Sequence, residues 1–241
     1  KRQVRHQAGA ITLDDQPISR FSPRELASCL GYVGQDANCP FNFSVRDVVS
    51  MGLYARKEPK NGKQIVADAM DELGVSALDD RNIQTLSGGE RKMVFIARAI
   101  AQGARMLILD EPTVGLDVIA RDEVLNMLRE YMEENESSSI LISSHISSDL
   151  ESLCDDFYMI HAGKIILHED TDVLLSDYAV LKVSEEEYEK LDQQYLIKIR
   201  KEAYGYRCLT NQKQFYMENY PDVVIENGKI DDLVVMMEEQ V

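Results

Sequence analysis

A short apolar run that ends in two carboxylates restricts the fold of this chain more than any other feature. Residues 106–109 read Met-Leu-Ile-Leu, and Asp110 and Glu111 follow directly. A continuous apolar run of this length is typical of a strand buried in a parallel sheet. Ligands bind such sheets outside the carboxyl ends of the strands. The sequence therefore predicts that Asp110 and Glu111 line a site at that edge.

A turn rich in small residues comes before this strand. Residues 86–91 read Leu-Ser-Gly-Gly-Glu-Arg, and a long apolar helix is expected at 91–102. The first N–H groups of a helix have no partner within it and attract anions such as phosphate. Glycine at 88 and 89 lets the backbone approach an anion closely, because glycine has no Cβ. We therefore expect this turn to bind phosphate.

Elsewhere in the first part of the chain, strand patterns alternate with helix patterns. We expect strands at 10–13, 31–34, 106–109 and 139–143, and helices at 23–30, 64–73, 91–102 and 118–134, with a further helix starting at Ser44. This alternation predicts an α/β fold with a mostly parallel sheet covered on both faces. Residues from about 40 to 85 form a helical insertion in it.

The pattern changes after about Asp170. Before that point we expect a helix at 148–153 and a hairpin of strands at 157–160 and 164–167. Beyond it, strands are expected at 180–183, 196–200, 207–209 and 223–225, and helices at 184–191, 212–220 and 230–239. The chain is thus expected to divide into residues 1–170 and a small α+β extension at 171–241.

The composition restricts the partners. The net charge is −16, and a surface so acidic repels the phosphate backbone, so nucleic acid is not an expected partner. Hydrophobic residues make up 44% of the chain, which is an ordinary value for a globular protein. The longest apolar runs, around Leu107 and Ile140, are far shorter than the ~20 residues of a membrane-spanning helix.

Taken in order, these motifs resemble those of the ATP-binding cassette (ABC) ATPases, the motor subunits of ABC transporters. Residues 86–91 are similar to the family's signature motif, and residues 106–111 to its Walker B strand. Gln35 falls at the Q-loop glutamine, residues 114–117 look like the D-loop, and His145 stands at the switch histidine. The resemblance implies a RecA-like P-loop NTPase core, truncated at its N-terminus, with a helical signature subdomain at about 40–95.

The resemblance also implies ATP and Mg²⁺ as cofactors and gives two residues catalytic roles. Glu111 would act as general base on the attacking water, and His145 would contact the γ-phosphate and position that water. Asp110 would hold Mg²⁺ through its waters, and Gln35 would touch the metal region. His6, His161 and His168 lack such a context and receive no role.

The remaining residues implied by the resemblance bind nucleotide across a pair of cassettes. Ser87, Gly88 and Gly89 would stabilise the γ-phosphate of a nucleotide held by the other subunit, and Asp117 would cross the dimer interface. Two cassettes, identical or different, would therefore have to meet head to tail.

One part of the family pattern is absent from the 241 residues. The P-loop pattern G-x-x-x-x-G-K-[ST] does not occur, since Gly62-Lys63, Gly163-Lys164 and Gly228-Lys229 lack both the following Ser or Thr and the earlier Gly. Two explanations are open: a fragment of a complete ATPase, or a truncated or recombined product that does not bind ATP by itself. The front resembles iron-chelate and metal importers, and the part after about Thr113 resembles export or peptide-resistance ATPases, which suggests a junction.

We therefore expect an ATP-binding and ATP-hydrolysing subunit that drives a separate transmembrane permease. It would lie in the cytoplasm, peripherally on the inner face of the cell membrane. The alternative is an ABC-like interaction module without catalysis, and a soluble ABC protein of translation or DNA repair is a weaker third hypothesis. The transported substrate and the direction of transport are not encoded in these motifs.

Overall fold

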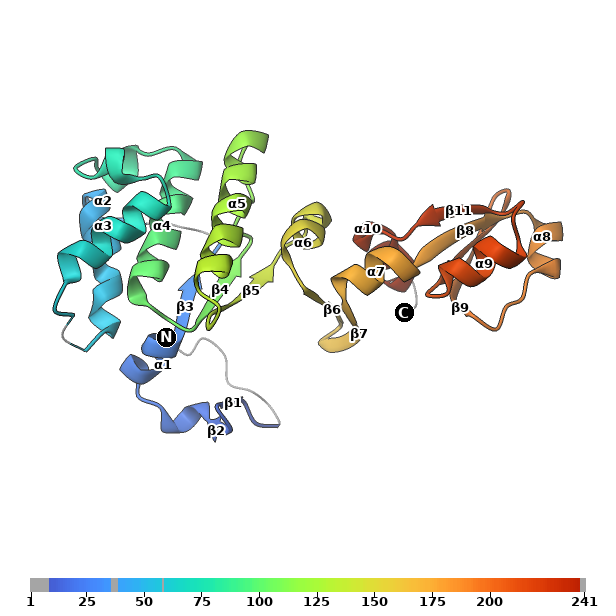
Figure 1. The fold of residues 1–241 in the computed structure, drawn as a ribbon, viewed down its shortest axis with the longest axis horizontal. Helices are drawn as coiled ribbons and strands as arrows, with labels where there is room; N and C mark the ends of the chain where they lie inside the picture. The colour runs from blue at the N-terminus through green and yellow to red at the C-terminus, as the bar shows by residue number, and fades with distance from the viewer. Residues whose placement is uncertain (1–8, 36–38, 58, 239–241) are drawn as a thin grey trace. The chain divides into compact units, whose positions relative to one another are not determined.

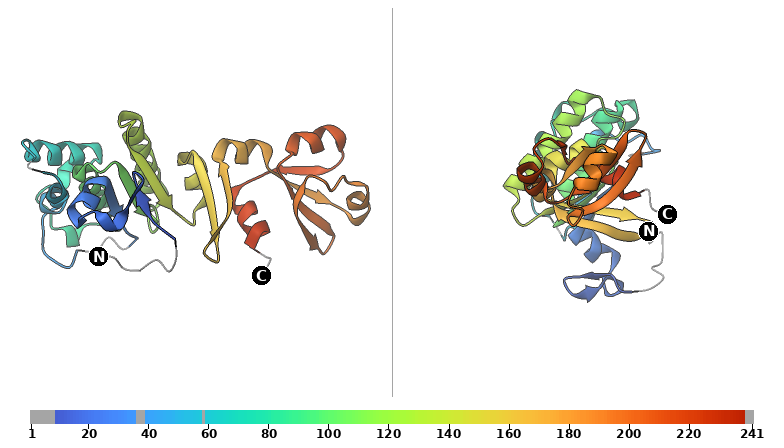
Figure 2. Two further views of the ribbon diagram at one scale, coloured as in Figure 1. Left: turned by 90° about the horizontal axis from the view of Figure 1, so that it is seen from below. Right: turned by 90° about the vertical axis from the view of Figure 1, so that its right-hand side faces the viewer.

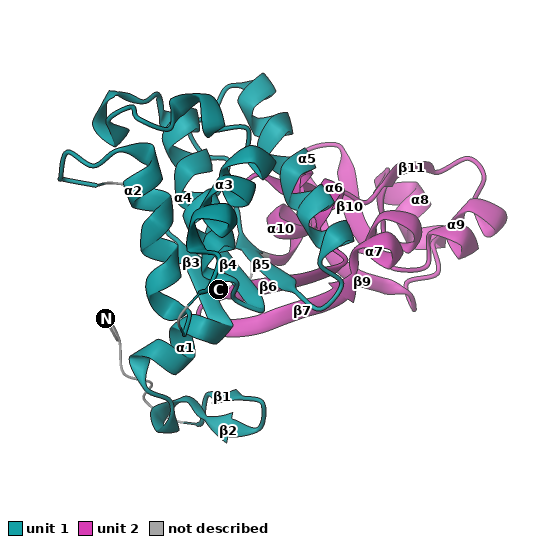
Figure 3. Cartoon of the chain, turned by 60° about the vertical axis from the view of Figure 1, so that its left-hand side comes forward, with its two compact units in different colours: residues 1–144 teal, residues 145–241 magenta. Residues whose placement is uncertain are grey.

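The computed structural model of the protein describes residues 9–35, 39–57 and 59–238. The chain divides into two compact units, residues 1–144 (unit 1) and residues 145–241 (unit 2), which Figure 3 shows in teal and magenta. Figure 1 shows how strands and helices alternate along unit 1. The predicted α/β class is confirmed for this part of the chain.

The core of unit 1 contains a three-stranded parallel sheet in the order β3-β4-β5. Its strands are β3 (Leu30–Val33), β4 (Met106–Asp110) and β5 (Ser139–Ser143). Val33 pairs with Leu109, and Asp110 pairs with Ser143. The three strands therefore end at one edge, with Asp110 at that edge as the sequence predicts.

Two helices cover one face of this sheet. They are α4 (Gly88–Gln102), which leads into β4, and α5 (Val118–Glu134), which links β4 to β5. The connection from β3 to β4 and the connection from β4 to β5 progress in the same direction across the sheet. Because crossovers between parallel strands are right-handed, both helices lie on the same face. Leu107 and Leu109 on that face are fully buried, whereas Tyr32 and Leu141 on the other face are 57% and 53% exposed. The predicted covering of both faces is therefore wrong for the described part of unit 1.

Short helices fill the connection between β3 and α4, as predicted. They are α2 (Val45–Ser50), η2 (Met51–Ala55), α3 (Gly62–Glu72), η3 (Ser76–Leu78) and η4 (Ile83–Thr85). Ser44 and Asp47 begin α2 with a capping box, in which each side chain accepts a hydrogen bond from the other residue's N–H. The segments α2, η2 and α3 contact α4. The helical part is thereby fixed to the helix that starts at the Ser-Gly-Gly turn.

The part of unit 1 before the sheet is small. A hairpin joins β1 (Thr12–Leu13) to β2 (Gln16–Pro17), and η1 (Ile18–Arg20) and α1 (Pro23–Cys29) follow. A capping box of Ser22 and Glu25 begins α1, which confirms the helix expected from residue 23, and Ser-Pro-x-Glu is a typical helix start.

Unit 2 contains a four-stranded antiparallel sheet in the order β11-β8-β10-β9. Its strands are β8 (Ala179–Val183), β9 (Leu196–Glu202), β10 (Gly205–Thr210) and β11 (Val224–Asn227). The helix α8 (Glu185–Lys190) separates the first two strands, and α9 (Lys213–Asn219) the last two. Chain order βαββαβ with spatial order 4-1-3-2 is the split βαβ arrangement of ferredoxin-like folds. The predicted strands and helices are confirmed, whereas α7 (Thr171–Asp177) was not predicted.

Both faces of this second sheet are covered. Leu181 and Cys208 pack on one face with Tyr216 of α9 and the partly buried Tyr188 of α8. On the other face, Val180 and Leu209 pack with residues of α10 (Ile230–Glu238) and of the hairpin β6 (Asp156–His161) and β7 (Lys164–Asp170). Figure 2 shows the two yellow strands of this hairpin side by side.

This shared core explains why the boundary between the two compact units lies between residues 144 and 145 in the sequence, before residue 170. Phe157 and Met159 of β6 are buried in the same cluster as Leu233 of α10, so the hairpin and α6 (Ser147–Leu153) group with the second sheet. The expected division of the chain into residues 1–170 and 171–241 stays a prediction.

Candidate functional site

The carboxylate of Asp110 is held at the end of β4 by the two neighbouring strands. Ser143 Oγ, at the end of β5, donates a hydrogen bond of 2.6 Å to Asp110 Oδ1, and Tyr32 Oη, from β3, lies 3.4 Å from Oδ2. Burial and the nearby Asp110 carboxylate raise the pKa of Tyr32, so this phenol stays protonated and can donate. Two neutral hydroxyl groups therefore orient the Asp110 carboxylate.

The residue after Asp110 has an unusual backbone. Glu111 has a φ of +50°, in the left-handed region that non-glycine residues rarely adopt, and its N–H donates to the carbonyl oxygen of Ser143 at 2.9 Å. Such a conformation costs on the order of 1–2 kcal/mol and is frequent at functional sites. The chain therefore leaves the extended strand conformation directly after Asp110. The conformation supports a functional role for Glu111.

Gln35 follows β3 at the same edge of the sheet and is exposed. The buried Lys92 of α4 donates from Nζ to the carbonyl oxygens of Gly34 and Gln35, at 3.4 and 3.2 Å. These bonds tie the start of the Gln35 loop to the helix that begins at the Ser-Gly-Gly turn. The role of Lys92 was missed, although the sequence carries a signal: a lysine among the apolar residues of α4.

Replacement of Lys92 by Met should loosen this connection. The two carbonyl oxygens would lose a charged donor, and hydrogen bonds to charged groups contribute about 1.5–3 kcal/mol. We expect faster amide hydrogen exchange at Gly34 and Gln35, measured by mass spectrometry or NMR, with α4 unchanged. Lys63→Met, on the exposed side of α3, is the control. Equal exchange in both variants would show that Lys92 does not hold the loop.

The Ser-Gly-Gly turn forms the N-terminus of α4. Ser87 is the N-cap: its Oγ accepts from Glu90 N at 3.2 Å, and Glu90 Oε2 accepts from Ser87 N at 2.7 Å. The Ser87 bonds hold the pKa of Glu90 below its usual value, so Glu90 is charged and acts as a structural cap. A Cβ built on Gly88 would meet no atom within 4 Å, so packing does not require glycine there. The open space beside Gly88 would allow a ligand to approach the backbone closely, and such an approach would explain the glycine.

Gly89 links this turn to the segment after Glu111. A Cβ built on Gly89 would lie 3.5 Å from Leu116 Cδ2 and 3.6 Å from Ala120 Cβ, which is ordinary contact. The structure therefore brings the turn beside the expected D-loop. Asp117 in that loop caps α5, since its Oδ1 accepts from the N–H groups of Ile119 and Ala120 at 3.0 Å each. Capping is the role that the structure gives Asp117, and contact with a second subunit stays a prediction.

His145 is the first residue of unit 2 and is exposed. It follows β5 by two positions in the sequence, as expected for a residue near the strand end. Its action on the same phosphate as Asp110 and Glu111 stays a prediction.

The residues at this edge suit Mg²⁺ held largely by water and phosphate. In the part of the chain that the structure describes, no group of three or more His, Cys, Asp or Glu side chains is arranged to hold a metal. Mg²⁺ usually keeps several waters and takes one or two carboxylates together with substrate phosphates. Asp110, with Gln35 on the neighbouring strand end, provides oxygen donors of that kind.

The chain is similar to several known proteins. The family model described as ABC transporter matches residues 1–114. The chain is 31% identical over 169 residues to the hemin import ATP-binding protein HmuV of Shewanella denitrificans, covering 68% of this chain and 66% of that protein. It is 30% identical to the lipopolysaccharide export system ATP-binding protein LptB of Haemophilus influenzae, covering 75% of each chain. It is 33% identical to the chelated iron transport system membrane protein YfeB of Yersinia pestis, covering 66% of this chain and 54% of that protein.

Solved structures are similar as well. CbiO1 of Clostridium perfringens, described as part of the ABC transporter complex cbiONQ, aligns with a TM-score of 0.61 and 32% identity over 69% of this chain and 67% of that one. A putative metal-chelate type ABC transporter in an inward-facing conformation aligns with a TM-score of 0.55 and 24% identity over 75% of this chain and 71% of that one, which bears on the fold alone. The chain thus spans less than two thirds of several relatives that it matches, including 54% of YfeB.

Proposed function

Because the chain belongs to the ABC transporter ATP-binding family, we propose that it binds and hydrolyses ATP to drive transport by a separate permease. The observation that carries this proposal is the carboxylate pair at the end of β4. Asp110 is oriented by Ser143 and Tyr32, and Glu111 beside it is turned by a strained backbone. An ordinary strand end does not need either feature.

In the proposed mechanism, Asp110 orients the waters of Mg²⁺, which when bound neutralises charge on the β- and γ-phosphates. Glu111 accepts a proton from the water that attacks the γ-phosphate, as a general base placed beside the metal ligand. His145 contacts the γ-phosphate and positions that water. Gln35 contacts the metal region. The Ser143 and Tyr32 hydroxyls keep Asp110 directed at the sheet edge during the reaction.

The Ser-Gly-Gly turn is proposed to serve a nucleotide on a second cassette. Ser87, Gly88 and Gly89 start the 15-residue helix α4, whose N-terminus carries a partial positive charge. The N–H groups and the Ser87 hydroxyl would stabilise charge that develops on the transferred phosphate. Asp117 would lie at the same interface between two cassettes that meet head to tail.

The permease is proposed to dock on the helical part of unit 1, on the inner face of the membrane. Among the residues that the structure describes, none of the helices has the length and apolar character of a membrane span. Phe41 and Tyr54, beside α2 and within η2, are 63% and 81% exposed. Large exposed aromatic side chains are common at protein interfaces.

The alternative is a cassette-shaped module that docks without hydrolysis. The comparisons do not favour it, since the relatives are named as ATP-binding proteins. The test uses a complete version of the chain that carries a P-loop, purifies it with the permease encoded beside it and with a second cassette, and measures MgATP hydrolysis in proteoliposomes. Hydrolysis that needs Asp110 supports the proposal. A complex that forms but hydrolyses no ATP, with or without the second cassette, would establish the alternative.

A further inference from the structure

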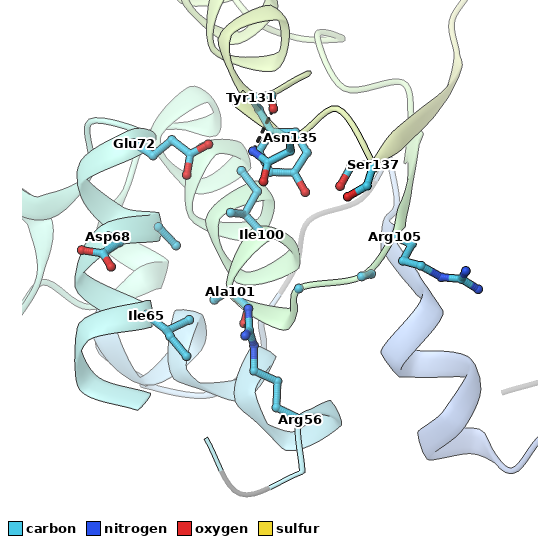
Figure 4. A pocket seen from close by; sticks show the side chains of 14 residues that line it. Arg56, Ile65, Asp68, Glu72, Ile100, Ala101, Arg105, Tyr131, Asn135 and Ser137 are labelled. Atoms are coloured by element: carbon cyan, nitrogen blue, oxygen red, sulfur yellow. Dashed lines mark hydrogen bonds between the residues drawn. The ribbon is translucent and has the colours of Figure 1, made fainter. Parts of the chain in front are cut away.

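His145 lies between a lightly packed strand and a more firmly held helix. The strand is β5, which pairs with β4 alone among the residues that the structure describes, and none of its five residues is buried. Ser137 and Ser138, just before β5, border a cavity of about 420 Å³ in unit 1 (Figure 4). In α6, by contrast, Ser147 and Asp149 are buried. The position of His145 therefore depends mainly on the helix that follows it.

The helix α6, which begins two residues after His145, is bonded to α10 at two points. Ser147 Oγ donates a hydrogen bond to Asp231 Oδ1. One turn later, Glu151 Oε1 accepts a hydrogen bond of 2.9 Å from the backbone N–H of Ile230, the first residue of α10. Residues four apart lie on the same face of a helix, so one face of α6 is held along the start of α10.

The helix α10 is in turn fixed to the second sheet. Leu233 is fully buried in the core that it shares with Leu209 of β10. Arg207, also in β10, donates a hydrogen bond of 2.8 Å to Asp232 Oδ1. The partly buried Leu150 of α6 packs against the same core. Hydrogen bonds and apolar contacts thus connect the four-stranded sheet, through α10, to the start of α6.

We propose that α10 positions His145 for ATP hydrolysis, through the hydrogen bond between Ser147 and Asp231. This role rests on the proposed function, in which His145 contacts the γ-phosphate and positions the attacking water. A misplacement of about 1 Å can cost about 10²-fold in rate. The bond fixes the backbone two residues from His145, so its loss would leave the imidazole intact but less well placed. Asp231 is a positioning residue, and the second sheet contributes to hydrolysis without a catalytic group of its own.

The first test measures amide hydrogen exchange in α6 by NMR, on the purified chain without nucleotide. Its reporter is Asp149, whose N–H donates to the carbonyl oxygen of Ile146 at 3.1 Å. Asp231→Ala removes the acceptor of the Ser147 hydroxyl and Ser147→Ala removes the donor, so each should speed exchange at Asp149 about tenfold. Asp231→Asn keeps an acceptor oxygen and should exchange close to the wild-type rate.

Asp172→Ala is the matched control. Asp172 is exposed and is the second residue of α7, as Asp231 is the second residue of α10. Its replacement removes a carboxylate from a first helical turn, where negative charge is favourable, and leaves the bond between Ser147 and Asp231 in place. Exchange at Asp149 should therefore not change.

The second test measures ATP hydrolysis by a complete version of the chain that carries a P-loop, assembled with its permease and a second cassette. Asp231→Ala and Ser147→Ala should lower kcat at least about tenfold and leave the KM for MgATP unchanged, because His145 acts on the reaction rather than on binding. Asp231→Asn should keep most of the rate, and Asp172→Ala all of it. Each variant is assayed at a temperature at which circular dichroism shows it to be folded.

The proposal is overturned if exchange at Asp149 is unchanged in Asp231→Ala and Ser147→Ala. It is also overturned if the wild-type assembly hydrolyses ATP and these two variants have the same kcat as wild type, or if Asp172→Ala loses as much activity as they do. A wild-type assembly that hydrolyses no ATP would contradict the proposed function itself, and with it any catalytic contribution of α10.

Discussion

Replacement of Glu111 by Gln should lower the kcat of ATP hydrolysis by about 10²–10⁴-fold in a complete version of the chain that carries a P-loop, assembled with its permease and a second cassette. Glutamine keeps the size of the side chain and can hold the attacking water, but it cannot accept the proton. MgATP binding should remain, because Asp110 and its partner Ser143 are untouched. The variant should therefore accumulate in an ATP-bound state with two cassettes associated. Steady-state phosphate release and size-exclusion chromatography with MgATP measure the two effects.

The control for this variant is Glu136→Gln, which removes a carboxylate from an exposed position after α5. It should hydrolyse ATP at the wild-type rate. Ser143→Ala provides an intermediate case, since it leaves Glu111 in place but removes the 2.6 Å hydrogen bond that orients Asp110. We expect its main effect on the Mg²⁺ concentration needed for half-maximal rate. If Glu111→Gln turns over at a near-normal rate, another group is the base.

The edge of the sheet could be predicted because two local signals agree there. Residues 106–109 form a continuous apolar run, and two carboxylates end it, so strand and site follow from one stretch. The starts of α1 and α2 were equally accessible, because a capping box is encoded within four residues. The capping box of Ser87 and Glu90 carries the same signal, but the helix was expected from residue 91, and α4 begins at Gly88. Each of these features depends on neighbours in the sequence.

The features that were missed depend on contacts between distant residues. Tyr32 and Ser143 flank Asp110 only through the register of three parallel strands, and Lys92 meets Gly34 and Gln35 across 57 or 58 positions. The exposed sheet face follows from the direction of two successive crossovers, which no local pattern encodes. In β3 the exposed Tyr32 lies between the buried residues Gly31 and Val33. This alternation places Tyr32 on the same face of the sheet as Asp110.

The hairpin β6–β7 shows the same limit at the level of domains. Its strands were predicted, but its grouping with the second sheet arises from Phe157 and Met159 packing beside Val180, Leu209 and Leu233. The 4-1-3-2 strand order likewise comes from pairing across the sheet. Hydrophobic periodicity gives the faces of each strand but leaves the choice of partner open.

Replacement of Gly52 by Ala should destabilise unit 1 by about 3 kcal/mol, because it overpacks the contact between η2 and α4. A Cβ at this position would lie 2.3 Å from the carbonyl oxygen of Arg98 and 3.0 Å from the backbone N of Gln102. Both atoms belong to the backbone of α4, so the helix itself would have to shift. Urea unfolding of the purified chain measures the change, and the expected fall in melting temperature is about 9 °C.

Gly88→Ala separates this packing effect from the proposed function of the Ser-Gly-Gly turn. A Cβ on Gly88 meets open space, and alanine favours a helix start, so the free energy of unfolding should stay equal or rise by about 0.5 kcal/mol. The same methyl group would keep a phosphate away from the backbone, so ATP hydrolysis by the paired cassettes should fall at least about tenfold. Gly52→Ala should instead lower activity together with the free energy of unfolding. If Gly88→Ala hydrolyses ATP normally, close approach of phosphate to this turn is not part of the reaction.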